Sequence, residues 1–129
     1  MSGEVVVDTN VAIAFLRGEQ DIIAKVSVLE NIFLPVIVLG ELLYGAASSL
    51  HAKKNMLVVE QFAGDCILLM TSAQTAQKYA QIKSGLRKAG KPIPENDLWI
   101  AALALEHQAV LATRDLHFST IPSLNIAKW

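Results

Sequence analysis

The chain has 129 residues, of which 53% are hydrophobic, 18% are charged and only 6% are aromatic. This length predicts a single domain, residues 1–129, that can bury a core without disulfides or a structural metal, and the composition excludes a disordered chain. The formal net charge of −1 disfavours a general nucleic-acid binder, for which a pI above about 9 is typical, but not a nuclease that holds its substrate through a metal ion.

The single cysteine, Cys66, indicates a reducing compartment. It lies in the apolar run 66–70, where a thiol acts as a small buried hydrophobic group, and one cysteine cannot form an internal disulfide. The chain also lacks a signal-type segment at its start and any apolar stretch of roughly 18 residues, the length of a membrane span. We therefore expect a cytoplasmic protein with no membrane contact.

Short apolar runs alternate along the chain with segments of helical periodicity. The first run, 4–7, predicts a buried strand, and the residue types at 8–10 predict a helix start because they cap helices. Asn96 predicts another helix start, after the loop 90–94. The predicted helices span 8–17, 19–30, 36–49, 51–63, 72–89 and 97–107. The predicted strands span 4–7, 32–34, 66–70, 109–113 and 124–127.

This alternation predicts an α/β fold, a three-layer α/β/α sandwich with a mostly parallel central sheet of four to five strands. The aliphatic character of the apolar residues supports this prediction, because parallel strands that are buried on both faces are rich in Val, Ile and Leu. In such open sheets, ligands bind beyond the carboxyl ends of the strands, where the strand order reverses. That edge of the sheet is the expected position of a functional site.

Four carboxylates fall where strands give way to helices, and they include three of the five aspartates in the chain. The set is Asp8, Glu41, Asp97 and Asp115. Asp8 directly follows the first strand and Asp115 follows the fourth, so the two side chains converge if these strands are neighbours. A simple topology also brings Glu41 and Asp97 to this edge.

Clustered carboxylates of this kind predict a divalent-metal site. Like charges packed together raise the pKa of at least one of the groups, and a cation removes that conflict. Carboxylate oxygens suit Mg²⁺ and Mn²⁺, which bind phosphate oxygens and lower the pKa of a bound water. Asn10 and Thr113 are candidate supporting residues that orient the carboxylates through hydrogen bonds. The candidates for an additional positive charge are Arg17, Arg87, Lys88 and Lys91.

Each acidic residue also has an ordinary structural interpretation. Asp8 and Asp97 could simply cap helices, while Glu41 could be a solvated helix residue. Asp115 could form a turn. His117 could contact substrate or lie near the site, although a residue packed in a turn is the favoured interpretation. The four acids together favour a site, because all of them fall at the same predicted edge.

Four segments in this order carry a family pattern. They are 7–11 (VDTNV), 40–45 (GELLYG), 94–102 (PENDLWIAA) and 112–115 (ATRD) with His117 and Phe118. Together they resemble the PIN-domain ribonucleases, and most closely the VapC-like toxins of prokaryotic toxin–antitoxin operons. The likeness runs from the first strand to Trp129, and all the acidic positions are kept.

The resemblance implies catalytic and metal-ligand roles for Asp8, Glu41, Asp97 and Asp115, with Asn10 and Thr113 as supporting residues. It implies Mg²⁺ or Mn²⁺ in an acidic cleft and endonucleolytic cleavage of RNA, which would inhibit translation and growth. It also implies a homodimer and a cognate antitoxin whose C-terminal segment wraps the helices. The apolar helices within 11–29 and 36–49 would form a groove for an antitoxin helix.

Three other functions fit parts of the pattern. A phosphatase could use Asp8 as its nucleophile, but this class needs a second aspartate where the chain has Asn10. A partner-binding module, whose acidic cleft receives a basic peptide, would need no metal. A housekeeping RNA-processing nuclease could share the fold, and operon context would separate it from a toxin.

Overall fold

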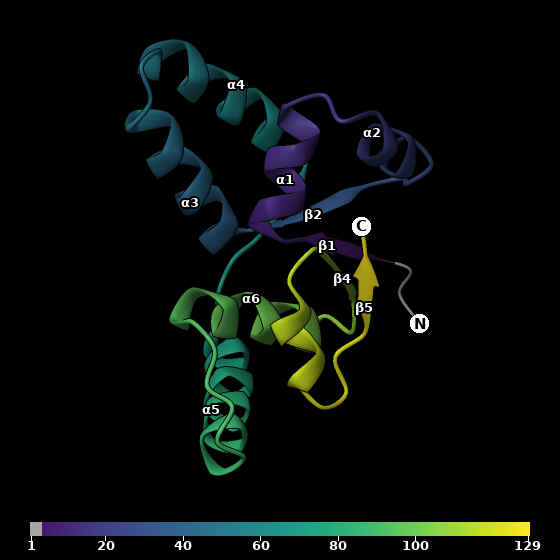
Figure 1. The fold of residues 1–129 in the computed structure, drawn as a ribbon, viewed down its shortest axis with the longest axis vertical. Coiled ribbons are helices and arrows are strands. Elements are labelled where there is room, and N and C mark those ends of the chain that lie inside the picture. Colours follow the sequence, from purple (N-terminus) through teal and green to yellow (C-terminus); the bar gives the residue numbers. More distant parts are fainter. Residues whose placement is uncertain (1–3) are drawn as a thin grey trace.

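A parallel sheet of five strands lies between two layers of helices in the computed structural model, which describes residues 4–129 (Figure 1). The strands are β1 (Val5–Val7), β2 (Ile32–Pro35), β3 (Ile67–Leu69), β4 (Val110–Thr113) and β5 (Ile126–Lys128). Their order is β3-β2-β1-β4-β5, and every neighbouring pair is parallel. The predicted α/β sandwich with a parallel sheet is therefore confirmed.

Six α-helices flank the sheet within residues 4–129, and Figure 1 shows the first four on one face and the last two on the other. They are α1 (Thr9–Leu16), α2 (Gln20–Ser27), α3 (Val36–Ala47), α4 (Ala52–Gly64), α5 (Ala73–Lys88) and α6 (Glu95–Glu106). A short 3₁₀ helix, η1 (Leu116–Thr120), was not predicted from the sequence. None of the helices in this range has both the length and the apolar character needed to cross a membrane.

The strand order reverses next to β1, the central strand. The connection through α1 and α2 leads to β2 on one side, whereas α5 and α6 return the chain to β4 on the other side. Val7 is in register with Ala112, and the Asp8 amide donates a hydrogen bond to the Ala112 carbonyl at 3.0 Å. The carboxyl ends of β1 and β4 therefore meet, as the predicted site requires.

The boundaries of α1 agree with its predicted capping residues. Asp8 is the N-cap, and its Oδ1 atom accepts a hydrogen bond from the Thr9 amide at 2.8 Å. Arg17 is the C-cap, and Gly18 follows with a φ of +80°, a conformation that glycine adopts without strain. The cap thus fixes the direction of the Asp8 carboxylate at the end of β1.

The start of α6 differs from the sequence-based expectation. We expected Asn96 to be the N-cap, but the helix begins at Glu95 and its N-cap is Pro94. The Pro94 carbonyl accepts the first helical hydrogen bond, from the Leu98 amide at 3.2 Å, and the proline ring restricts φ, which is −57°. Because the helix starts earlier, Asp97 is its third residue rather than its first.

Aliphatic side chains from the sheet and from both helical layers form the core. Ile100 and Leu103 of α6 and Leu111 of β4 each have 0% exposure, and α6 is buried on most sides, as predicted. Cys66, which we expected to be buried, is only half-buried, because it precedes the edge strand β3.

Replacing Leu111 by Ala should lower the free energy of unfolding by about 2–5 kcal/mol, because β4, an inner strand of the sheet, cannot collapse into the space that the side chain leaves. The matched control, Leu57→Ala in α4, removes a side chain that is 63% exposed. It should change this free energy by less than about 0.5 kcal/mol. Urea denaturation followed by circular dichroism measures both variants, and equal losses would contradict the assigned packing.

Candidate metal centre

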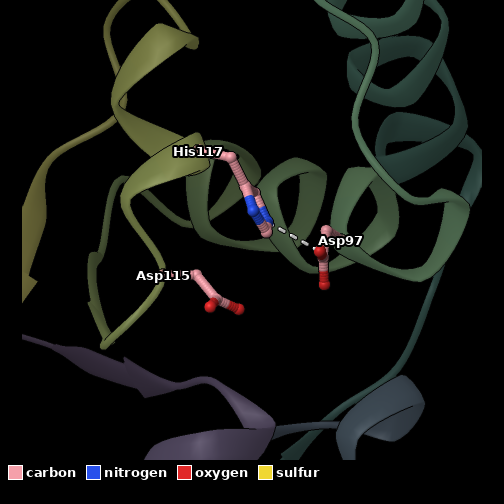
Figure 2. Close-up of side chains that lie close together, drawn as sticks. All are labelled: Asp97, Asp115 and His117. Carbon is pink, nitrogen blue, oxygen red and sulfur yellow. Dashed lines mark hydrogen bonds and ion pairs between the residues drawn. The ribbon is translucent and has the colours of Figure 1, made fainter.

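Three side chains converge at the edge of the sheet where β1 and β4 end (Figure 2). Asp97 comes from the first turn of α6, Asp115 from the segment after β4 and His117 from η1. One ligand atom of each lies within 4.8 Å of those of the other two. The Nε2 atom of His117 is 2.7 Å from Oδ2 of Asp97, and this contact is also an ion pair when the imidazole is protonated.

Asp8 lies beside this group, close enough for its charge to interact with Asp97 and Asp115, but is not one of its three members. Only 2% of Asp8 is exposed. Its Oδ1 atom accepts the hydrogen bond from the Thr9 amide, and its Oδ2 atom accepts one from the Thr113 hydroxyl at 2.7 Å. These two bonds fix the orientation of the buried carboxylate.

Glu41 reaches the site through Thr9. The Thr9 hydroxyl donates a hydrogen bond to Oε1 of Glu41 at 2.8 Å, while the Thr9 amide donates to Asp8. A cavity of about 560 Å³ has Thr9, Glu41 and Asn96 among its lining residues, so Glu41 borders the same hollow as the start of α6. The structure therefore places Glu41 one hydrogen-bonded residue away from Asp8, outside the three-residue group.

The two predicted supporting residues both contact the segment after β4. The Thr113 hydroxyl donates to Asp8 and accepts a hydrogen bond from the Asp115 amide at 3.0 Å, and Thr113 is 1% exposed. The Oδ1 atom of Asn10 accepts a hydrogen bond from the Arg114 amide at 3.3 Å. Thr113 thus joins the two strand ends that carry Asp8 and Asp115.

Negative charge at the site is not balanced by lysine or arginine. Burial raises the pKa of Asp8, and repulsion from Asp97 and Asp115 raises this pKa further, against two hydrogen bonds that lower it. Burial also raises the pKa of Asp97, and Asp115 adds to the increase, although His117 lowers this pKa. No lysine or arginine within residues 4–129 forms an ion pair with these three aspartates.

The cationic candidates lie elsewhere. Arg17 borders a different cleft, which also contacts Glu41. The remaining three are exposed residues at and beyond the C-terminal end of α5, namely Arg87, Lys88 and Lys91.

The side chains at the site suit a divalent cation. Carboxylate oxygens and an imidazole nitrogen are ligands for hard and borderline divalent metals. A cation would also relieve the repulsion among carboxylates that are held together in partly buried positions. Within the described part of the chain, Asp97, Asp115 and His117 form the one group whose ligand atoms lie close enough together that it could hold an ion.

Sequence reasoning undervalued two residues of this arrangement. For His117 a residue packed in a turn was favoured over one near the site, but its ring nitrogen contacts Asp97. The two-residue spacing between Asp115 and His117 is the signal that could have identified it. Thr9 was interpreted only as a helix starter, although its hydroxyl holds Glu41.

With the fold and this acidic site established, comparison with known proteins identifies the family. The model of the family described as PIN domain matches residues 5–124. Ribonuclease VapC1 of Haemophilus influenzae is 32% identical over 127 residues, which is 95% of each chain. The tRNA(fMet)-specific endonuclease VapC of Salmonella typhimurium is 32% identical over 95% of each chain. Toxin FitB of Neisseria gonorrhoeae is 34% identical over 86% of this chain and 87% of its own length.

Solved structures agree with this result. The chain is similar to VapBC2 from Rickettsia felis, with a TM-score of 0.92 and 26% identity over 97% of this chain and 98% of that one. It is also similar to VapBC from Salmonella typhimurium, with a TM-score of 0.91 and 30% identity over 98% of each chain. The chain belongs to the PIN domain family.

Asp97→Asn should make the metal-free protein more stable at neutral pH. Because burial raises the pKa of Asp97 above its ordinary value of 3.8, the folded state holds the proton more tightly than the unfolded state. This contribution to stability is complete below the ordinary pKa and is lost as pH rises through the raised one. Asn has no such proton to lose, and its oxygen can still accept the hydrogen bond from His117.

The difference in melting temperature, variant minus wild type, should therefore grow as pH rises from about 4 to about 7. Differential scanning fluorimetry in EDTA measures it. A difference that is constant or falls with pH would contradict the assigned repulsion.

Proposed function

We propose that this chain is a divalent-metal-dependent endoribonuclease, the toxin of a toxin–antitoxin pair, acting in the cytoplasm as one PIN domain over residues 1–129. The observation that carries the proposal is the convergence of Asp97, Asp115 and His117 beside the buried Asp8 in a chain of the PIN domain family. Relatives at 32–34% identity are a ribonuclease, a tRNA(fMet)-specific endonuclease and a toxin, which supports RNA as the substrate.

The residues that would hold Mg²⁺ or Mn²⁺ are Asp8, Glu41, Asp97 and Asp115. When bound, such an ion neutralises phosphate charge and supplies hydroxide from water near neutral pH. Thr113 holds the Asp8 carboxylate and the Asp115 amide in a fixed relation, and Thr9 holds Glu41. These side chains are oriented before the substrate arrives, which lowers the reorganisation that the reaction requires.

The phosphatase alternative loses support at Asn10. This class needs a second aspartate there, whereas Oδ1 of Asn10 accepts a hydrogen bond from the Arg114 amide. The peptide-binding alternative predicts a function that survives loss of the carboxylates and of metal, so the following experiment separates it from a nuclease.

Asp8→Asn and Asp97→Asn should each reduce RNA cleavage by at least about 100-fold, because each removes a charge that the metal site requires. The matched control is Asp65→Asn, on an exposed aspartate at the C-cap of α4, and it should keep wild-type activity. The measurement maps new 5′ ends in total RNA incubated with purified protein and Mn²⁺, with and without EDTA. Undiminished cleavage by folded Asn variants, or in EDTA, would sink the metal mechanism.

An apolar groove on the α1–α4 face fits the proposed antitoxin. One cleft of about 350 Å³ lies between α1, α3 and α4, and a second of about 410 Å³ lies between α1, α2 and α4. Leu16 and Val58 line both clefts, so the two adjoin. The groove expected from the sequence lay between the helices within 11–29 and 36–49, and α4 forms a further wall of the groove. An amphipathic helix of the antitoxin would bury its apolar face there.

We also propose a homodimer, as the resemblance implies. Tyr44 and Leu50, at the end of α3 and just beyond it, are 76% and 95% exposed. Apolar side chains exposed to this extent can be covered by a second copy of the chain.

Val58→Asp should weaken binding of the proposed cognate antitoxin by about tenfold or more, because an unpaired charge in an apolar groove costs more than about 1.4 kcal/mol. RNA cleavage should stay unchanged, because Val58 lies on α4, which supplies none of the proposed metal ligands. Met70→Asp is the control, on a side chain that is 59% exposed and lines neither cleft. Biolayer interferometry gives both dissociation constants, and equal affinities would place the antitoxin on another surface.

A further inference from the structure

We propose that His117 is itself a ligand of the divalent cation, through Nε2, and that this nitrogen shifts the selectivity of the site from Mg²⁺ toward first-row transition ions such as Mn²⁺. The inference rests on the proposed function, because it names a further ligand and the preferred cation of the same site.

The position of the imidazole is that of a ligand. Nε2 of His117 is 2.7 Å from Oδ2 of Asp97, and one ligand atom of each of Asp97, Asp115 and His117 lies within 4.8 Å of those of the other two. Two ligands at neighbouring positions on an octahedral ion, each at about 2.1 Å, stand about 3 Å apart. One ion can therefore contact both residues once their hydrogen bond is given up, when the imidazole carries its proton on Nδ1 and turns the lone pair of Nε2 from Asp97 to the ion. Figure 2 shows the ring of His117 directed toward Asp97, with the carboxylate of Asp115 nearby.

The ring is held in place by η1. Phe118, the next residue, is 0% exposed and anchors the 3₁₀ helix in the core. The rings of His117 and Phe118 are 4.9 Å apart and tilted by 38°, and the Thr120 hydroxyl donates a hydrogen bond to the His117 carbonyl at 2.8 Å. The side chain of His117 is nevertheless 36% exposed, so an ion can reach its ring from solvent. Nε2 of His117 points at Asp97, whose side chain is only 16% exposed. Packing alone does not require this direction of the ring.

The chemistry of nitrogen decides the selectivity. Mg²⁺ prefers an all-oxygen environment and keeps several waters, whereas imidazole is a good ligand for borderline transition ions. A site of carboxylates alone would not discriminate strongly between Mg²⁺ and Mn²⁺. A neutral imidazole in the place of a water leaves the charge of the carboxylates unchanged and adds a nitrogen donor, which a transition ion such as Mn²⁺ accepts more readily than Mg²⁺ does.

The test uses the untagged full-length chain, so that its three histidines are the only imidazoles present. Mn²⁺ is the probe, and electron spin echo envelope modulation detects ¹⁴N bound directly to the ion. We expect ¹⁴N modulation in the wild type and in the control His51→Gln, which changes an exposed histidine at the N-cap of α4. We expect none in His117→Gln.

Titration calorimetry gives the second readout, which does not depend on activity. His117→Gln should weaken Mn²⁺ binding by at least about tenfold, with a smaller effect on Mg²⁺. His117→Asp puts an oxygen ligand in the place of the nitrogen. It should keep Mg²⁺ binding and lower the ratio of Mn²⁺ affinity to Mg²⁺ affinity relative to wild type.

Two results would overturn the inference. One is Mn²⁺ bound to the wild type without ¹⁴N modulation, and the other is modulation that persists in His117→Gln. If the wild type still cleaves RNA with added metal in either case, only the role of His117 fails and the nuclease proposal stands. A wild-type chain that binds neither cation and does not cleave RNA would overturn both proposals.

Discussion

The parallel pairing of β1 with β4 is the constraint on which the site depends. It places the ends of two strands, more than a hundred residues apart in the chain, side by side, so that Asp8 and Thr113 become neighbours. The Thr113 hydroxyl then donates a hydrogen bond to Asp8 and accepts one from the Asp115 amide. α6 completes the group by adding Asp97 from its first turn. A one-residue slip in this register would turn Thr113 to the opposite face of the sheet and separate the carboxylates.

The same arrangement opposes stability. Burial and mutual repulsion raise the pKa of Asp8 and of Asp97, so the folded chain holds charges that it would retain more easily in water. Destabilising carboxylates of this kind are retained where function requires them. Without such a requirement, substitution by neutral residues would stabilise the fold. The surrounding core of α6 and β4, with Ile100, Leu103 and Leu111 at 0% exposure, supplies the compensating stability.

Much of the fold could be predicted because its signals are local. Apolar runs marked the strands, and the residue types at 8–10 marked the start of α1. The start of α6 was misplaced by two residues, since a proline N-cap leaves no side-chain capping signal and Asn96 supplied a false one. The position of His117 was missed for a different reason. Its contact with Asp97 spans twenty residues and depends on a 3₁₀ helix that has no periodicity to detect.

One helix serves two surfaces. The N-terminal end of α1 carries Asp8 and Thr9 toward the carboxylates, while Ile13 and Leu16 further along line the apolar groove. Any protein that moves α1 when it occupies the groove also moves Asp8, one of the proposed ligands of the ion. Thermodynamic reciprocity then requires that the ion alter the affinity of that protein by the same factor. The concentration of the metal ion in the cell would in this way alter the affinity between this chain and the protein in its groove, with no additional sensor.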